Sequence, residues 1–416
     1  MQAFDVLVVG GGSAGLAAAV ASARAGAQTL LVERLGSIGG MAPAALVHSI
    51  CGLYRLPSNG WPPVLANPGF ASEFARRLIE SGGASGPVRM GRVDVLLQNP
   101  TAFACLADVL IRETPRLKLL LHTEVSRLSA AGEATLSCRG QSIDVRAQTV
   151  VDASGDGVVA ALIGAPFEQS PSDRLQRPAF IFGMAGVDTN DFGDDVRLGL
   201  AGLISSGVKD GQLSAAALGV AFRATGHSGE VFATLDLAGS SDFDPTNPET
   251  LATLEQDGRQ TASEIVCFLR NNSPKFLRAF ASAFPNQVGI RESRRVAGQY
   301  RLQADDLQLG REFADAVALA TWPIELRETN RGPRLRYPID GRPCEIPLRS
   351  LRFRDHPEFF VAGRCLSCSH EAQASIRVIG TCLATGEAAG FAAASLALHG
   401  EATADRIRKL RQEFAS

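Results

Sequence analysis

The stretch "DVLVVGGGSAGLAAAVASARAGA", residues 5–27, contains an aliphatic run, a glycine cluster and a helical pattern in direct succession. Val6–Val9 has the composition of a buried parallel strand. Gly10, Gly12 and Gly15 fit the spacing G-x-G-x-x-G, which permits a tight turn, close approach of the backbone to a pyrophosphate, and packing of the next helix on the strand. The N-terminus of that helix offers free N–H groups to phosphates. The stretch therefore predicts a dinucleotide-binding strand–turn–helix unit.

A second strand and an acidic residue support this prediction. Thr29–Val32 is aliphatic and ends at Glu33, about 20 residues after the glycines, where a carboxylate accepts hydrogen bonds from ribose hydroxyls. A signal peptide or membrane segment is the alternative, but no basic region precedes the run and glycines interrupt it. FAD and NAD share the motif, so this stretch leaves the identity of the dinucleotide open.

The composition of the whole chain is that of an ordinary globular protein. It has 416 residues, 45% of them hydrophobic, and a net charge of −2, which predicts no nucleic-acid partner. We find no tandem repeat and expect no membrane span. Eight cysteines in a chain without a signal peptide predict a reduced, cytoplasmic protein.

The next segments mix helices with a small antiparallel meander. Residues 57–70 hold four prolines and predict an irregular excursion. Helices are predicted over Phe70–Glu80 and from Asn99-Pro100 through Glu113. Strand-like runs follow, and turn signals between them predict a meander inserted into the nucleotide domain; these runs are Leu117–Val125, Glu133–Cys138 and Ser142–Val145. Thr149–Asp152 then opens "VVDASGDG", a second turn that we expect to face the ligand.

The pattern changes between about residues 171 and 337. Helical stretches alternate there with short strands and predict a second α+β domain that covers the first; examples are helices at Asn247–Leu269 and Ser273–Phe284 and a strand at Glu230–Leu237. "HPEFFVAGRC" then restores a buried strand, and "TCLATGEAAGFAAASLAL" is a helix of small residues. The predicted fold is α/β, with a discontinuous Rossmann-like domain (1–56, 96–168 and 338–416) carrying the meander, and a substrate or cap domain (57–95 and 169–337).

The C-terminal stretch "FFVAGRCLSCSHEAQASIRVIGTCLATGEAAGFAAA", residues 359–394, indicates FAD rather than NAD. An elongated FAD needs contacts at the far end of the chain because its flavin lies far from its adenosine. With "GIRESRRVAGQYRLQADDLQLGREFADAVA", this stretch resembles the FAD-dependent oxidoreductases of the glutathione-reductase-like superfamily, and most closely the broad bacterial FAD-dependent oxidoreductase family. The resemblance implies an FAD enzyme.

The resemblance also implies which residues contact the cofactor. They contribute pyrophosphate, ribose, adenine and flavin contacts, and the helix at 381–394 would direct the N–H groups near its start at the flavin, where its dipole stabilises the anionic reduced form. The implied set is Gly10, Gly12, Ser13, Ala14, Gly15, Glu33, Arg34, Gly40, Met41, Val125, Ala153, Gly155, Asp156, Gly363, Arg364, Gly380, Thr381 and Cys382.

Three residues are candidates for catalysis. In a looser similarity to fumarate-reductase-type flavoproteins, His370 and Arg377 occupy places that face the substrate, although "HEA" replaces their His-Gly. His370 beside Glu371 is predicted as a general acid/base, with a structural hydrogen bond as the alternative. Arg377 is predicted to bind a substrate carboxylate or carbonyl or the flavin, with a buried ion pair as the alternative. Arg291, partnered by the next residue Glu292, is the third candidate, unless its charge run is solvated.

For the other reactive side chains we predict neither covalent attachment of FAD, nor redox chemistry, nor metal binding. His48 and Cys51 follow the second glycine pair and permit covalent attachment of FAD, but packed side chains are the favoured reading. Cys365 and Cys368 form a C-x-x-C pair, which is the pattern of a redox dithiol that exchanges electrons with flavin in disulfide reductases. No second G-x-G-x-x-G domain for NAD follows, however, so this redox hypothesis is disfavoured. No ligand spacing indicates a metal.

The favoured function is hydride transfer between flavin N5 and a small or medium polar organic substrate. The alternative is a flavin monooxygenase of hydroxylase or halogenase type: "VVDASGDG" resembles the hydroxylase Asp-Gly turn, but the Ser-x-x-Arg continuation is missing. A flavin-binding subunit without catalysis is a third reading. The sequence leaves open the substrate, a separate electron donor or acceptor, and the oligomeric state.

Overall fold

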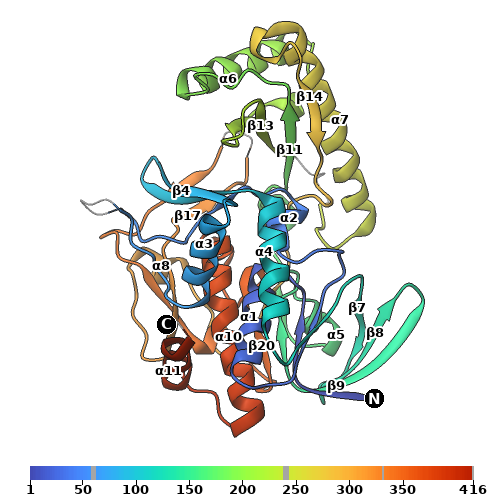
Figure 1. The fold of residues 1–416 in the computed structure, drawn as a ribbon, viewed down its shortest axis with the longest axis vertical. Coiled ribbons are helices and arrows are strands. Elements are labelled where there is room, and N and C mark those ends of the chain that lie inside the picture. The colour runs from blue at the N-terminus through green and yellow to red at the C-terminus, as the bar shows by residue number, and fades with distance from the viewer. Residues whose placement is uncertain (58–61, 238–242, 330–331, 415–416) are drawn as a thin grey trace.

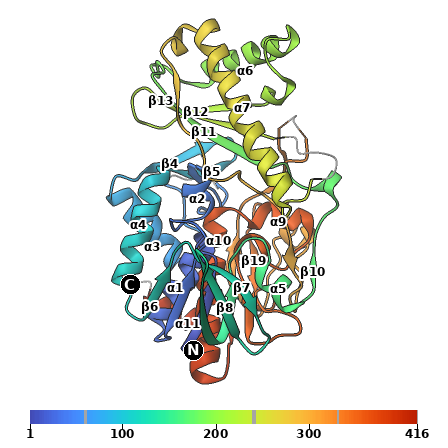
Figure 2. The same ribbon diagram turned by 90° about the vertical axis from the view of Figure 1, so that its right-hand side faces the viewer.

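A parallel sheet built from the opening stretch forms the centre of the molecule. A computed structural model describes residues 1–57, 62–237, 243–329 and 332–414 (Figures 1 and 2). Strand β1 (Gln2–Val9) lies between β2 (Thr29–Val32) and β9 (Gln141–Asp152), and the sheet is completed on either side by β6 (Leu117–Leu120) and β20 (Phe359–Val361). All these pairs are parallel. Their carboxyl ends therefore share one edge, where ligands bind in such sheets.

The antiparallel meander is confirmed, with two corrections. It consists of β7 (Glu124–Leu128), β8 (Glu133–Cys138) and the first half of β9. The predicted strand Leu117–Val125 is in fact two strands. Its first part, β6, pairs parallel with β2, because the backbone turns at His122, where φ is +52°. The two runs predicted at 142–145 and 149–152 are one continuous strand, β9.

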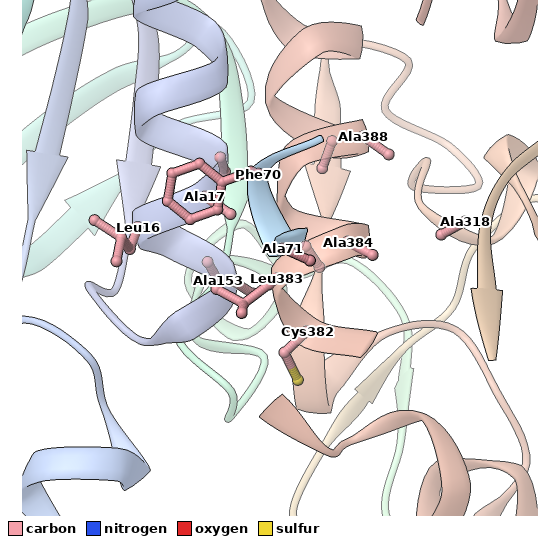
Figure 3. Packing of buried hydrophobic residues seen from close by; sticks show 14 of the residues in the cluster. Leu16, Ala17, Phe70, Ala71, Ala153, Ala318, Cys382, Leu383, Ala384 and Ala388 are labelled. Carbon is pink, nitrogen blue, oxygen red and sulfur yellow. The ribbon is translucent and has the colours of Figure 1, made fainter. Parts of the chain in front are cut away.

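Two helices of small residues pack against each other in the core beside this sheet. They are α1 (Ser13–Arg24) and α10 (Ile379–His399). A Cβ at Gly386 would lie 2.1 Å from the Ala14 carbonyl oxygen, and one at Gly390 would lie 2.2 Å from that of Ala18. The helices can therefore approach at backbone distance only because glycines occupy these positions. Figure 3 shows this contact and the buried Phe70 of the neighbouring helix α3 (Phe70–Glu80).

Within the described part of the chain, α10 is the one helix long and apolar enough to cross a membrane by length and composition. However, 83% of its apolar window is buried inside the protein. It is therefore enclosed by its own chain, as a core helix is.

The helices at 70–80 and 100–113 are confirmed as α3 (Phe70–Glu80) and α4 (Pro100–Glu113). The Asn99 side chain caps α4 by accepting hydrogen bonds from two backbone N–H groups. Phe74 and Phe103 pack at a centroid distance of 4.5 Å, so α3 lies in the core of the parallel sheet although its sequence falls in the segment 57–95 assigned to the cap. That segment includes residues 58–61, which lie outside the described residues. The predicted domain bounds stay a prediction.

A second sheet and core lie at the top of Figures 1 and 2. The sheet has the order β12 (Ala221–Ala224), β13 (Glu230–Asp236), β11 (Ala179–Ala185), β14 (Phe280–Ala283). With it pack α6 (Asp194–Lys209) and α7 (Pro248–Asn272), whose apolar residues join its own core. The helix predicted over Ser273–Phe284 is wrong, because this segment forms a short 3₁₀ turn and then pairs with β11 as β14. We call this second unit the cap.

Short elements complete the chain. Before the cap these are α2 (Met41–Ala44), β3 (Ser49–Ile50), β4 (Ala84–Met90), β5 (Val93–Gln98), α5 (Val158–Ile163), β10 (Phe167–Glu168) and the 3₁₀ turn Ser172–Arg174. The cap itself contains the 3₁₀ turn Ala215–Ala217. In the returning segment they are β15 (Arg295–Val296), α8 (Ala304–Gln308), β16 (Ala316–Ala320), β17 (Ile324–Leu326), β18 (Arg334–Arg336), β19 (Cys344–Pro347), 3₁₀ turns at Leu348–Ser350 and Gly363–Cys365, α9 (His370–Ile376) and α11 (Ala404–Phe414). The predicted class, α/β with a Rossmann-like core, is confirmed.

Candidate functional site

The three glycines of the opening motif have different structural roles. A Cβ at Gly10, where φ is +96°, would lie 2.7 Å from the Ala153 carbonyl oxygen, and one at Gly15 would lie 1.8 Å from that of Gly10. At Gly12 the nearest atom to such a Cβ would be Gly40 Cα, 3.9 Å away. The protein itself therefore requires glycine at the first and third positions, while Gly12 borders open space. That space suits the pyrophosphate of a dinucleotide.

Glu33 holds the glycine turn to the end of β2. Its Oε2 accepts a hydrogen bond of 2.6 Å from the Gly11 N–H, and its Oε1 accepts one of 2.7 Å from the Leu35 N–H. A carboxylate has further lone pairs, so these bonds leave capacity for ribose hydroxyls. The neighbouring Arg34 is exposed and donates to the side chain of Gln287.

Other predicted cofactor residues gather at the same edge. The Ser13 hydroxyl lies 3.4 Å from the Gly39 carbonyl, just before Gly40 and Met41, which start α2. A Cβ at Gly363 would lie 2.9 Å from Ala14 Cβ. Val125 is buried at the start of β7. The structure thus brings together segments that are up to about 350 residues apart in the chain.

A second turn is formed by residues 152–156. Asp152 is fully buried, and burial raises its pKa; its carboxylate accepts hydrogen bonds from Ser154 and from the Val159 N–H. Arg364 Nη2 lies 2.8 Å from Asp156 Oδ1, and a Cβ at Gly155 would lie 2.9 Å from the same Nη2. The predicted residues Gly155, Asp156 and Arg364 therefore form one cluster, in which the two charges compensate.

The start of α10 differs from the expectation. The helix begins at Ile379, so the Cys382 N–H donates to the Val378 carbonyl, and the Gly380 N–H donates to that of Cys51, both at 2.9 Å. These two N–H groups are therefore not directed at a ligand. Thr381 Oγ1, however, is buried and has no hydrogen-bond partner within the described residues. An orphaned hydroxyl here, with the open space at Gly12, fits a polar cofactor such as FAD.

His370 is held between two carboxylates. Its Nδ1 lies 2.9 Å from Glu292 Oε1 and its Nε2 lies 3.3 Å from Glu328 Oε1. Burial lowers its pKa, but the hydrogen bond and the charge of Glu292 outweigh burial and raise it. The expected partner Glu371 instead forms an ion pair with Arg336 at 2.9 Å. Both ring nitrogens are engaged, which favours a structural role for His370 over general acid/base catalysis.

Arg291 also has a different partner from the one expected. Its Nη2 lies 2.7 Å from Asp236 Oδ1 at the end of β13, an ion pair without hydrogen-bond geometry, while Glu292 pairs with Arg295 at 2.5 Å. Asp236 also binds Arg327 at 2.9 Å. Asp236 and Arg327 were missed, since nothing in the sequence connects a strand-terminal aspartate with an arginine about 90 residues later.

Arg377 has no carboxylate bound to it among the described residues. Its Nη2 lies 3.2 Å from Gln176 Oε1, and its Nε is buried without a partner. The nearby Glu325 is already bound by Trp322 Nε1 and Arg327 Nε. Burial, followed by the charge of Arg291, lowers the pKa of Arg377 to about 10, while Glu325 acts in the opposite direction. Arg377 therefore keeps its charge at neutral pH, and no described carboxylate is bound to it.

His48 and Cys51 lie opposite the cap. The His48 ring stacks on Phe232 of β13 at a centroid distance of 4.7 Å, and its Nδ1 lies 3.2 Å from the Leu46 carbonyl. Burial and the charge of Arg223 lower the pKa of His48 to about 4, so the ring is neutral. Burial and Glu325 raise the pKa of Cys51 to about 12. These contacts are those of packed side chains.

The C-x-x-C pair is not a disulfide. Cys365 and Cys368 are both free and buried, and the Cys368 sulfur lies 3.2 Å from the Leu366 carbonyl. Burial raises the pKa of both thiols, that of Cys368 to about 12. Among the described residues, no group of three or more His, Cys, Asp or Glu side chains could hold a metal ion.

Comparison with known proteins identifies the family. Residues 5–414 match the family model described as FAD dependent oxidoreductase. The chain belongs to the FAD dependent oxidoreductase family. It is therefore an oxidoreductase, and its cofactor is FAD, in agreement with the open space at Gly12 and the orphaned hydroxyl of Thr381.

Two curated relatives match only parts of the chain. A tRNA uridine 5-carboxymethylaminomethyl modification enzyme, MnmG, from Dichelobacter nodosus is 32% identical over 163 residues, covering 36% of this chain and 24% of that protein. The MnmG of Wolinella succinogenes is 52% identical over 60 residues, covering 12% of this chain and 10% of that protein. The chain thus matches less than a quarter of the length of these relatives.

A solved structure shows the same fold over the full chain. The crystal structure of p-nitrophenol 4-monooxygenase PnpA from Pseudomonas putida DLL-E4 aligns with a TM-score of 0.52 and 12% identity, covering 100% of this chain and 87% of that one. At this identity the likeness concerns the fold alone.

Proposed function

We propose that this enzyme transfers a hydride between flavin N5 and a small or medium polar organic substrate, and that Arg377 binds a carboxylate of that substrate. The observation that carries the proposal is the state of Arg377: a half-buried side chain whose Nε is buried without a partner, with no carboxylate bound to it among the described residues. Burying a charge without a counter-ion is costly, so a site of this kind is suited to an anionic ligand.

The position of Arg377 supports the same role. It directly follows α9 and precedes α10, near the orphaned Thr381 hydroxyl, so it lies close to the part of the chain predicted to contact the flavin. Bound FAD supplies a ring that accepts or donates a hydride. A carboxylate held by a guanidinium fork fixes the orientation of a substrate as well as its position.

Neighbouring residues hold Arg377 in place. Gln176 Oε1 accepts from Arg377 Nη2, and Gln176 Nε2 donates to Gln373 Oε1 at 2.7 Å. Gln373 in turn donates to the Arg291 carbonyl at 2.7 Å. This amide chain crosses from α9 to the start of the cap, and it orients the guanidinium without neutralising it. The two glutamines are positioning residues in this proposal.

A ligand series tests the role of Arg377. Purified holoenzyme is titrated with acetate, propionate, butyrate and hexanoate, and in parallel with the corresponding primary amides, while flavin absorbance is recorded. We expect carboxylates to bind more tightly than amides, and Arg377→Gln to weaken carboxylate binding by about tenfold or more. Arg336→Gln removes an exposed charge and is the matched control. Equal carboxylate affinities in wild type and Arg377→Gln would overturn the assignment.

A kinetic experiment separates hydride transfer from the monooxygenase alternative. Reduced holoenzyme is mixed with oxygen in a stopped-flow instrument, and the return of oxidised flavin absorbance is followed. If the flavin absorbance returns in a single phase, the result supports hydride transfer. A separate absorbance phase before the oxidised flavin appears supports oxygenation.

A further inference from the structure

A second arginine near Cys51 belongs to the cap. Arg223 lies on β12, where it is the cross-strand partner of Phe232 on β13. Side chains of directly opposed residues lie on the same face of a sheet. Because Phe232 stacks on His48 of the parallel-sheet body, Arg223 lies on the cap face that is turned toward His48 and Cys51. The alternate residues Phe222 and Ala233 point the other way, into the core of the cap.

Arg223 has no counter-ion in the part of the chain that the structure describes. Within the described residues it forms no ion pair, and its Nη1 lies 2.7 Å from the sulfur of Met90, a thioether and therefore a weak acceptor. Burial lowers its pKa, and the charge of Arg197 acts in the same direction. Arg291 and Arg327, by contrast, each have a counter-ion, because both form an ion pair with Asp236.

Arg223 and Arg377 approach the segment around Cys51 from different units. Arg223 lies on the cap face turned toward His48, and Arg377 precedes helix α10, whose Gly380 N–H donates to the Cys51 carbonyl at 2.9 Å. Both charges lower the pKa of the Cys51 thiol, against the stronger effects of burial and Glu325. The two guanidinium groups thus come from different units, and neither has a carboxylate bound to it among the described residues. A molecule with two anionic groups can supply one of them to each arginine.

We infer that the substrate is a dicarboxylate, or another organic acid with two anionic groups, of which one binds Arg377 and the second binds Arg223 of the cap. This inference rests on the proposed role of Arg377 and adds the second anchor. His48, which stacks on Phe232 beside Arg223, is neutral, so Arg223 is the charged group that would bind the anion on this face. A substrate bound in this way spans the body and the cap.

Binding of matched acids tests the inference. Holoenzyme is titrated calorimetrically with malonate, succinate, glutarate and adipate, and with the monoanions propionate, butyrate, valerate and hexanoate of the same carbon number. We expect at least one diacid to bind about tenfold or more tightly than its matched monoacid. Arg223→Gln should remove that advantage and leave monoacid binding unchanged, and Arg223→Lys should restore part of it.

The controls separate this inference from the proposed function. Arg197→Gln removes a neighbouring cap charge that is more exposed, and it should leave both series unchanged. Arg377→Gln should weaken both series, and if it leaves both unchanged the proposed function fails. If no diacid binds more tightly than its monoacid, or if Arg223→Gln preserves the advantage, the second anchor is refuted. Circular dichroism and FAD content confirm that each variant is folded.

Discussion

His370 Nδ1 lies 2.9 Å from Oε1 of Glu292, a carboxylate without exposed surface that also accepts a 2.7 Å hydrogen bond from the Ser170 hydroxyl. The Gln176 backbone N–H donates to the same carboxylate at 3.2 Å. Ser170 and Gln176 precede the cap sheet in the chain, and Glu292 follows it. His370 therefore joins the body to both chain segments that connect it with the cap.

The first prediction concerns the pH dependence of stability. The folded-state pKa of His370 is raised and that of Glu292 is lowered, with the opposing effect of burial outweighed in both cases by their mutual interaction. The His370 contribution is thus fully present below its unfolded pKa of about 6.5 and is lost as the pH rises through the folded value. His370→Gln should lower the free energy of unfolding by about 1–3 kcal/mol at pH 6, and by less at pH 9.

Denaturant unfolding of the holoenzyme at the two pH values measures this difference. His227→Gln changes an exposed histidine of the cap and should have no effect at either pH. A loss of stability that is equal at pH 6 and pH 9 contradicts the imidazolium–carboxylate interaction.

The second prediction separates the glycines of the opening motif. Gly12→Ala should fold, because its φ is −66° and the new Cβ meets no protein atom closer than 3.9 Å, but it should lose FAD affinity by about tenfold or more. Gly15→Ala should instead disturb folding, because its Cβ would lie 1.8 Å from the Gly10 carbonyl oxygen. Flavin content and circular dichroism report the two effects. Full FAD retention in folded Gly12→Ala refutes the pyrophosphate placement.

The third prediction concerns Asp236, the shared counter-ion of two arginines. Asp236→Asn leaves Arg291 and Arg327 without this carboxylate in a buried position, and we expect it to destabilise the protein by about 3–5 kcal/mol. Asp194→Asn breaks an exposed ion pair with Arg197 and should cost less than about 1 kcal/mol. Thermal unfolding of both variants tests this, and equal effects of the two substitutions contradict it.

The fourth prediction concerns thiol reactivity. Iodoacetamide at pH 8 should modify the exposed Cys105 and Cys267 first. Four other thiols are buried, and burial both shields them from the reagent and raises their pKa, so they stay protonated; these are Cys344, Cys365, Cys368 and Cys382. Peptide mass spectrometry gives the order of modification. Early modification of Cys365 or Cys368, or a disulfide between them, would restore the redox hypothesis.

Much of the parallel-sheet core could be predicted from the sequence because its signals are local. The Val6–Val9 strand, the glycine spacing and Glu33 lie within one βαβ unit, and each constrains its own backbone. The same holds for α4, whose start is set by its Asn99-Pro100 cap. The helix wrongly predicted at 273–284 shows the limit, because pairing with β11 overrides the local helical pattern there.

The partners of the charged residues were decided by the tertiary structure alone. His370 was expected to bind its neighbour Glu371 but binds Glu292, and Arg291 was expected to bind its neighbour Glu292 but binds Asp236. Neighbours in sequence are poor guides, because an ion pair forms wherever folding buries two opposite charges together. The isolated Arg223 carried no signal in the sequence, and only the pairing of β12 with β13 placed it opposite His48. The sequence alone thus determined the nucleotide fold, and the packing of the cap on the body decided which charges face one another.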